Sequence, residues 1–257
     1  MVARIVPFVV AALAVLLIGV GIMVGLAPRM PQTTPSAQPE PLVPGWASPI
    51  PLPPAVDGPQ VREGASGYAD EAWVVATAEA TRIPARALAA YAGVAIWKSG
   101  DSFSCGLTWT TLAAIGEVES DHGRHGGSSI GADGRAEPPI FGVALDGNGV
   151  ALIPDSDGGE IDGDAEIDRA VGPMQLIPQA WRNWHIDANM DGVEDPHNID
   201  DAVMAAANYL CRASSDVTNE QGWRAAIGAY NASAAYIQRV ADVANRLAED
   251  AGIERLP

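Results

Sequence analysis

Basic residues are scarce in this 257-residue sequence. It contains 15 Lys and Arg against 32 Asp and Glu, which gives a formal net charge of -17 at pH 7. A charge of this sign repels the phosphates of nucleic acids and of anionic lipid head groups. We therefore expect no nucleic-acid partner.

Cysteine is nearly absent, and the two that occur, Cys105 and Cys211, lie far apart in the sequence. Neither has a Cys or His neighbour at zinc-ligand spacing, and the four histidines form no HExxH pattern, which argues against a zinc site. Outside the cytoplasm we expect the pair to be oxidised, and closing so long a loop contributes about 4 kcal/mol in the chain-entropy model. Two unpaired buried thiols are the alternative.

Long apolar runs are also few, and residues 5–26 form the one that is uncharged and long enough to cross a bilayer as a helix. Arg4 precedes the run and an acidic stretch follows it. The positive-inside rule therefore predicts a cytoplasmic tip at 1–4, a transmembrane anchor, and an extracytoplasmic remainder in the wall or periplasmic space. The alternative is a cleaved signal peptide, although the apolar region of such peptides usually holds only about 7 to 15 residues.

Proline dominates the next segment, residues 27–66, where apolar residues show little regular spacing. Such a composition favours an extended, semi-rigid linker. The folded domain is expected at 67–257. Its length suits one compact domain.

Helical signals dominate that domain. Apolar residues recur at three- and four-residue spacing after residue 67, Pro84 opens a second run, and Thr108 suits the N-cap of a third. Further helices are expected at 177–183, 199–213, 223–229 and 234–251. We predict a mainly α-helical fold.

Residues 123–168 instead are rich in Gly, Asp and Pro, and predict a long loop with a short hairpin around VALDGNGVALI. A loop of this length is usually functional or disordered. The acidic stretch 155–168 within it fits no metal-ligand frame cleanly. We expect a solvated loop there, close to the rim of a substrate cleft.

Glu119 stands on an apolar stripe of the third helix, with Leu112 and Ile115 on the same face. Burial raises the pKa of a carboxyl group because it disfavours the charged form, and a general acid needs that proton near neutral pH. Glu117 lies on a different part of the helix surface and should stay ionised. From periodicity alone, a solvated helix glutamate is the alternative for Glu119.

Three segments in order, GEVESDHGR, AVGPMQLIPQAW and AIGAYNAS, resemble the motif set of lytic murein transglycosylases with a lysozyme-like fold. The resemblance covers about residues 70–250 and is greatest to the membrane-bound lytic transglycosylase B branch, in an actinobacterial style. It implies cleavage of the β-1,4 bond between N-acetylmuramic acid and N-acetylglucosamine in peptidoglycan, with 1,6-anhydromuramic ends. No cofactor is implied for the chemistry.

The resemblance also implies roles for individual residues. Glu119 would be the single acid/base, and the substrate-binding residues would be Ser120, Gln175, Tyr230 and Asn231. The implied partners are peptidoglycan glycan strands and other cell-wall enzymes. Two alternatives stay open: a hydrolytic muramidase, for which Asp168 offers a second carboxylate, and a non-catalytic wall-binding scaffold.

The segment DANMDGVEDPHNIDDA is typical of the first half of a calcium loop, with Asp or Asn at positions 1, 3 and 5 and glycine at position 6. Position 12 is Asn198, where a standard EF-hand calcium loop has Glu. The family resemblance suggests a longer loop. The expected ligands of a structural Ca²⁺ are Asp187, Asn189, Asp191, Val193 and Asp201. A solvated Asp/Asn turn is the alternative.

Overall fold

The computed structural model describes residues 45–56, 64–254 and 256. The expected cytoplasmic tip at 1–4, the anchor at 5–26 and much of the linker lie outside the described residues. Within the described ranges, no helix has both the length and the apolar character needed to cross a bilayer.

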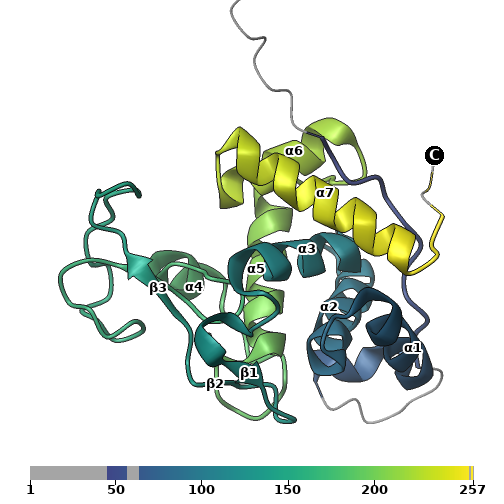
Figure 1. Ribbon diagram of the computed structural model, residues 1–257, viewed down its shortest axis with the longest axis horizontal. Helices are drawn as coiled ribbons and strands as arrows, with labels where there is room; N and C mark the ends of the chain where they lie inside the picture. Colours follow the sequence, from purple (N-terminus) through teal and green to yellow (C-terminus); the bar gives the residue numbers. More distant parts are fainter. Residues whose placement is uncertain (1–44, 57–63, 255, 257) are drawn as a thin grey trace, which may run out of the picture. The chain divides into compact units, whose positions relative to one another are not determined.

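The prediction of a mainly α-helical domain is confirmed (Figure 1). Seven α-helices occur among the described residues: α1 Glu71–Thr81, α2 Ala85–Ser99, α3 Trp109–Ser120, α4 Pro178–Trp184, α5 Ile199–Ala213, α6 Glu220–Tyr230 and α7 Ala234–Asp250. Two 3-10 turns, Ala65–Tyr68 and His125–Gly127, accompany them.

Side-chain caps explain where two of these helices begin. Asp70 accepts a hydrogen bond from the backbone N–H of Trp73 at 2.8 Å, and Thr108 accepts one from Thr111 at 3.3 Å. Each cap satisfies a backbone donor that has no partner within the first helical turn. The α3 helix then ends at Asp121, which takes the left-handed conformation with φ of 52°.

The α3 helix lies in the core, where it packs against α2, α5 and α7, and Figure 1 shows α7 running alongside it. Its first eight residues are all buried, so most of its surface faces other helices. Tyr91 of α2 comes so close to Gly116 that a Cβ there would lie 2.0 Å from the tyrosine hydroxyl. Cys105, just before α3, forms a disulfide with Cys211 of α5.

Short strands and loops fill the interval between α3 and α4. Strands β1 (Ser129–Ile130) and β2 (Ala136–Glu137) pair antiparallel, as do β3 (Phe141–Ala144) and β4 (Arg169–Val171). The expected hairpin around VALDGNGVALI forms only in part, because β3 takes β4 as its ladder partner. The loop returns through one bridge, Asp146 to Leu152.

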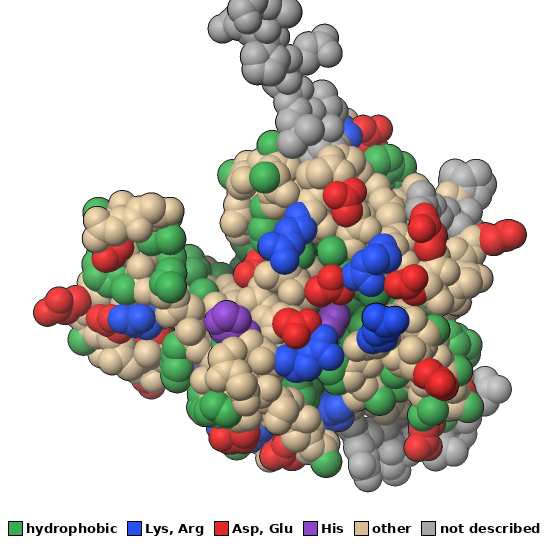
Figure 2. All heavy atoms as spheres, viewed as in Figure 1, with side chains coloured by type: hydrophobic (Ala, Val, Ile, Leu, Met, Phe, Trp, Pro, Cys, Tyr) green, Lys and Arg blue, Asp and Glu red, His purple; other side chains and the backbone are tan. Residues whose placement is uncertain are grey.

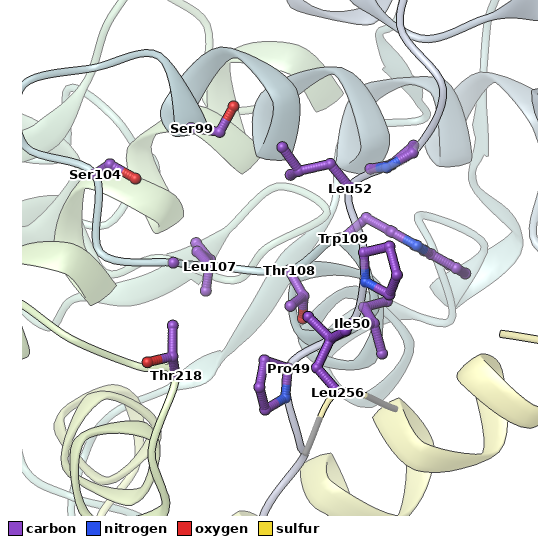
Figure 3. A pocket seen from close by; sticks show the side chains of 13 residues that line it. Pro49, Ile50, Leu52, Ser99, Ser104, Leu107, Thr108, Trp109, Thr218 and Leu256 are labelled. Atoms are coloured by element: carbon purple, nitrogen blue, oxygen red, sulfur yellow. The ribbon is translucent and has the colours of Figure 1, made fainter. Parts of the chain in front are cut away.

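Residues 45–56, expected to be linker, pack on the helical domain as a strap. The backbone N–H of Gly45 donates to Gln238 Oε1 at 2.6 Å, and Asn245 Nδ2 donates to the Trp46 carbonyl at 3.0 Å, so α7 holds the start of the strap. Further along, Pro49, Ile50 and Leu52 wall an apolar pocket of about 190 Å³, shown in Figure 3, together with side chains of the body and tail that include Leu107, Trp109 and Leu256. The folded domain therefore includes part of the proline-rich segment.

Candidate active site

Glu119 occupies the last turn of α3, where its side chain is partly exposed. Burial raises the pKa of Glu119 to about 7, because the charged carboxylate loses solvation there. The hydroxyl of Tyr236 and the charge of Arg239 act in the opposite direction but do not offset this burial. A large fraction of Glu119 therefore holds its proton at neutral pH.

Tyr236 of α7 is the direct partner of this carboxyl group. Its hydroxyl donates a hydrogen bond to Glu119 Oε1 at 2.5 Å. Burial and the neighbouring Glu119 raise the pKa of Tyr236, so the phenol stays protonated as a donor. Sequence reasoning missed Tyr236, although it stands only a few residues beyond the Tyr-Asn motif.

Glu117 lies two residues before Glu119 but in an ionic setting. Arg246 Nη2 contacts both of its oxygens, at 2.7 and 2.6 Å, and His122 Nε2 lies 3.5 Å from Oε2. Hydrogen bonds from His122 and Arg246 lower the pKa of Glu117 to about 2. In Figure 2 acidic and basic side chains intersperse on the face over α3 and α7.

A single turn, residues 172–175, ties the ends of α3 and α6 together. Ser120 is 2% exposed, and its hydroxyl donates to the Pro173 carbonyl at 2.6 Å while accepting from the Gly123 N–H at 2.8 Å. Tyr230, at the end of α6, donates to the Met174 carbonyl at 2.6 Å. The motif serine and tyrosine therefore fix the turn that carries Gln175.

Gln175 itself has φ of 48°, a left-handed conformation that is uncommon outside glycine. Its Nε2 donates to the Gly172 carbonyl at 2.9 Å. A Cβ at Gly142 of β3 would lie 2.8 Å from Gln175 Oε1, so a side chain there would displace this amide. Such strain at a non-glycine residue is typical of functional sites.

Tyr230 is the last residue of α6, and Asn231 follows it in the turn before α7. Burial raises the pKa of Tyr230 well above its usual value, and the charge of Glu119 adds to the effect, which places the two side chains in one electrostatic environment. Asn231 is exposed, and its Oδ1 accepts the Ser233 N–H at 3.0 Å. No hydrogen bond of its amide nitrogen occurs among the described residues.

The segment expected to bind calcium adopts a loop braced by its own carboxylates. Asp187 accepts from the N–H groups of Asp191 and Gly192 at 3.1 and 2.8 Å, and Gly192 has φ of 88°. Asp201 is fully buried and accepts three backbone N–H groups, from Ala188, Asn189 and Asp195. Among the described residues, the acids of this loop do not form a group of three with ligand atoms close enough to share a metal ion. Asp201 is engaged mainly as a brace, since a carboxylate has about four acceptor positions.

In the acidic stretch, the carboxylates of Asp155, Asp157 and Asp168 lie within 4.8 Å of one another. Asp168 is fully buried and accepts from the backbone N–H and the hydroxyl of Ser156, at 2.9 and 2.8 Å. Asp168, the second carboxylate that a hydrolytic muramidase would need, thus holds the loop together and has no exposed surface in this structure.

Comparison with known protein families gives a match over residues 105–251 to the family described as "Transglycosylase SLT domain". Neither a curated protein nor a solved structure matches the chain. The matched range begins at Cys105, ends just after α7, and includes Glu119, Gln175 and Tyr230.

Proposed function

The chain belongs to the Transglycosylase SLT domain family, whose members are lytic transglycosylases acting on peptidoglycan, and we propose that Glu119 is the single acid/base of its reaction. The enzyme class and the glycan substrate follow from the family. The observation that carries the proposal for Glu119 is its burial, which raises its pKa to about 7 beside the Tyr236 hydroxyl.

In the first step, protonated Glu119 gives its proton to the glycosidic oxygen between N-acetylmuramic acid C1 and N-acetylglucosamine C4. The C1–O bond breaks, and the glucosamine leaves with a 4-hydroxyl while C1 becomes oxocarbenium-like. In the second step, Glu119 takes the proton of the muramic C6 hydroxyl as O6 bonds to C1. The product is a 1,6-anhydro sugar, Glu119 is reprotonated, and no water is consumed.

The neighbouring groups suit this cycle. Tyr236 donates to the carboxyl group, and this bond strengthens when Glu119 is ionised between the two steps. The Asn231 amide and the second N–H and the carbonyl of the Gln175 amide would orient the muramic sugar, while Ser120 and Tyr230 hold the Gln175 turn in place.

A hydrolytic muramidase on the same fold needs a second carboxylate or an activated water. The burial of Asp168 and its hydrogen bonds to Ser156 argue against that carboxylate as the second group. Mass spectrometry of muropeptides released from purified sacculi separates the two reactions, because anhydro ends are lighter than reducing ends by one water. Binding without cleavage would instead identify a scaffold protein and overturn the proposal.

The protein is further proposed to be anchored by residues 5–26, with its catalytic domain on the wall side of the membrane and near other cell-wall enzymes. The uncharged run supports the anchor, and the disulfide of Cys105 and Cys211 suits an oxidising compartment. Membranes washed with alkaline carbonate should retain the full-length chain, and protease added to intact spheroplasts should digest its catalytic domain. Release by the wash would contradict the anchor.

Likeness to the membrane-bound lytic transglycosylase B branch and a structural Ca²⁺ at 187–193 belong to the same proposal. The support is the ligand spacing and the left-handed Gly192. Calcium should raise the melting temperature of chelator-treated protein, and Asp187→Asn should remove most of that rise. An equal melting temperature with and without calcium would exclude the site.

A further inference from the structure

The α7 helix presents two arginines on the side that faces α3, and only one of them is paired. Arg239 and Arg246 are seven residues apart, close to two full turns, so their side chains leave the same side of the helix. Arg246 bonds Glu117 and Asp250. Arg239 is exposed, and no ion pair or hydrogen bond of its guanidinium group is found among the described residues. In a chain with 15 basic and 32 acidic residues, that lack of a carboxylate partner requires an explanation.

Arg239 lies beside the catalytic carboxyl group. It follows Tyr236 by three residues, and side chains at that spacing are neighbours on a helix, with Cβ atoms about 5 to 6 Å apart. The Tyr236 hydroxyl reaches Glu119 Oε1 at 2.5 Å. Burial, the largest influence, raises the pKa of Glu119, while the Tyr236 hydrogen bond and the charge of Arg239 oppose it. Position on α7 and electrostatics therefore agree in placing the guanidinium group near Glu119.

Glu119 does not neutralise Arg239 when substrate binds. The proposed acid must hold its proton at that point, and a neutral carboxyl group leaves the positive charge of the guanidinium group uncompensated. Arginine stays charged at any working pH and presents planar N–H donors that match the two oxygens of a carboxylate. The free cation therefore favours an anionic group of the substrate close to the scissile bond.

Muramic acid has one group of this kind. Its 3-O-lactyl carboxyl is attached to the ring that reacts at C1, two carbons away along that ring, and neither sugar has another acidic group. In intact strands this carboxyl is bound in an amide to the peptide stem and is neutral. Hydrolysis of the amide consumes one water and leaves the lactyl carboxylate on the glycan.

We propose that Arg239 binds the free lactyl carboxylate of a stem-free muramic acid next to the scissile bond, and so selects strands from which the peptide has been removed. The inference rests on the proposed function and names the form of glycan on which the same site acts. The reaction that supplies this substrate is hydrolysis, by an amidase, of the bond between lactyl group and stem. Arg239 determines specificity, since proton transfer stays with Glu119.

The test uses three soluble substrates: stem-free strands with free lactyl carboxylates, the same strands after coupling of these carboxylates to methylamine, and strands with intact stems. Wild-type protein should show the lowest KM on the first. Arg239→Gln should raise that KM about fivefold and leave the KM on the methylamide strands unaltered, because the methylamide offers no charge to the guanidinium group. Arg239→Lys, which retains a cation without the planar pair of donors, should give an intermediate KM.

Arg212→Gln is the matched control and should leave all three KM values unaltered. Arg212 is an exposed arginine in the last turn of α5, where it lines a different hollow with Phe103 and Trp184, and its guanidinium group also has no ion pair or hydrogen bond among the described residues.

An effect of Arg239→Gln on turnover through Glu119 would be the same on all three substrates, so the contrast in KM is the decisive measurement. A lowest wild-type KM on another substrate, or equal KM changes of Arg239→Gln on the free and methylamide strands, would overturn the lactyl site. A rise in KM confined to stem-bearing strands would also overturn it and assign the cation to a stem carboxylate. Failure of the wild type to cleave any substrate would instead overturn the proposed function.

Discussion

Glu119 and Glu117 lie on two sides of the last turn of α3, and their carboxyl groups have opposite protonation states at neutral pH. On one side, Glu119 is held in a poorly solvated setting beside the Tyr236 hydroxyl, and its pKa rises to about 7. On the other side, Glu117 meets Arg246 and His122, and its pKa falls to about 2. Two glutamates in one helical turn are thereby separated into an acid and a permanent anion.

The α7 helix contributes to this difference, because it supplies the Tyr236 hydroxyl to one carboxyl group and the Arg246 cation to the other, while burial of Glu119 and the hydrogen bond of His122 to Glu117 are the larger causes. Tyr236 and Arg246 both belong to it. A carboxyl group deprived of water keeps its proton unless a charge compensates the loss. The comparison teaches that burial and local partners, and not position in the helix, set the states of the two glutamates, and each prediction below tests one glutamate against the other.

The largest effect is expected from Glu119→Gln, which retains the shape but removes the transferable proton. Turnover of peptidoglycan should fall by about 10² to 10⁴, the range that a positioned general acid contributes. Glu117→Gln is the matched control and should keep activity within a few-fold of the wild type. Release of anhydro-muropeptides, followed by mass spectrometry, measures both. Similar losses of turnover in the two variants would show that Glu119 has no catalytic role that Glu117 lacks.

The same Glu119→Gln variant should be more stable than the wild type at alkaline pH. The pKa of Glu119 is higher in the folded state than the value near 4.5 expected when unfolded, so folding favours the protonated form. The contribution of Glu119 to the free energy of unfolding of the wild type is fully present below about pH 4.5 and is lost as pH rises through about 7. Chemical denaturation at pH 8 should show the variant more stable by about 3 kcal/mol, and at pH 4 the gain should vanish.

A gain of equal size at both pH values would mean that repacking, and not ionisation, causes the stabilisation. The amide oxygen of the substituted side chain would still accept the Tyr236 hydroxyl, so loss of that hydrogen bond is not expected to mask the effect.

Tyr236→Phe is expected to have an intermediate effect. Removal of the donor destabilises the ionised carboxylate, so the pKa of Glu119 should rise above 7. Activity at pH 7 should fall about tenfold, because the carboxylate formed between the two steps loses a charge-assisted hydrogen bond. The alkaline limb of the pH–rate profile should move to higher pH. A lower rate with an unmoved limb would assign Tyr236 to packing alone.

The sequence predicts Glu119 itself better than it predicts the α7 residues that contact the two glutamates. The apolar stripe and the three ordered motifs indicated Glu119, and helical periodicity indicated most helices. Tyr236 went unnoticed, because a tyrosine on an amphipathic helix is indistinguishable in sequence from an ordinary core residue. The register of α7 on α3, which brings Tyr236 to Glu119 and Arg246 to Glu117, depends on contacts distant in the chain.

Proline composition misled in a similar way. Residues 45–56 have the composition of a linker, yet their backbone groups bond to Gln238, Asn245 and Asp70. A strap of this kind has no periodicity of its own, because its partners on the folded domain determine its path. The hairpin expected at VALDGNGVALI forms near its tip, where Asp146 pairs with Leu152, while β3 pairs with β4.

The smallest effect is expected from Arg246→Gln, which removes the cation from Glu117. The pKa of Glu117 is lowered in the folded state, so its contribution to stability is present above about pH 4.5 and is lost as pH falls through about 2. Because Glu117 and Arg246 are 28% and 45% exposed, solvent screens the pair, and the variant should lose no more than about 1 kcal/mol at pH 7. Added salt should shrink that difference, as measured by denaturation in low and high salt.

Peptidoglycan cleavage and its pH–rate profile should not change in Arg246→Gln, since Arg246 contacts Glu117 and not Glu119. A shifted profile would show that the two glutamates titrate as a coupled pair, and the separation of acid from anion along this turn would then fail.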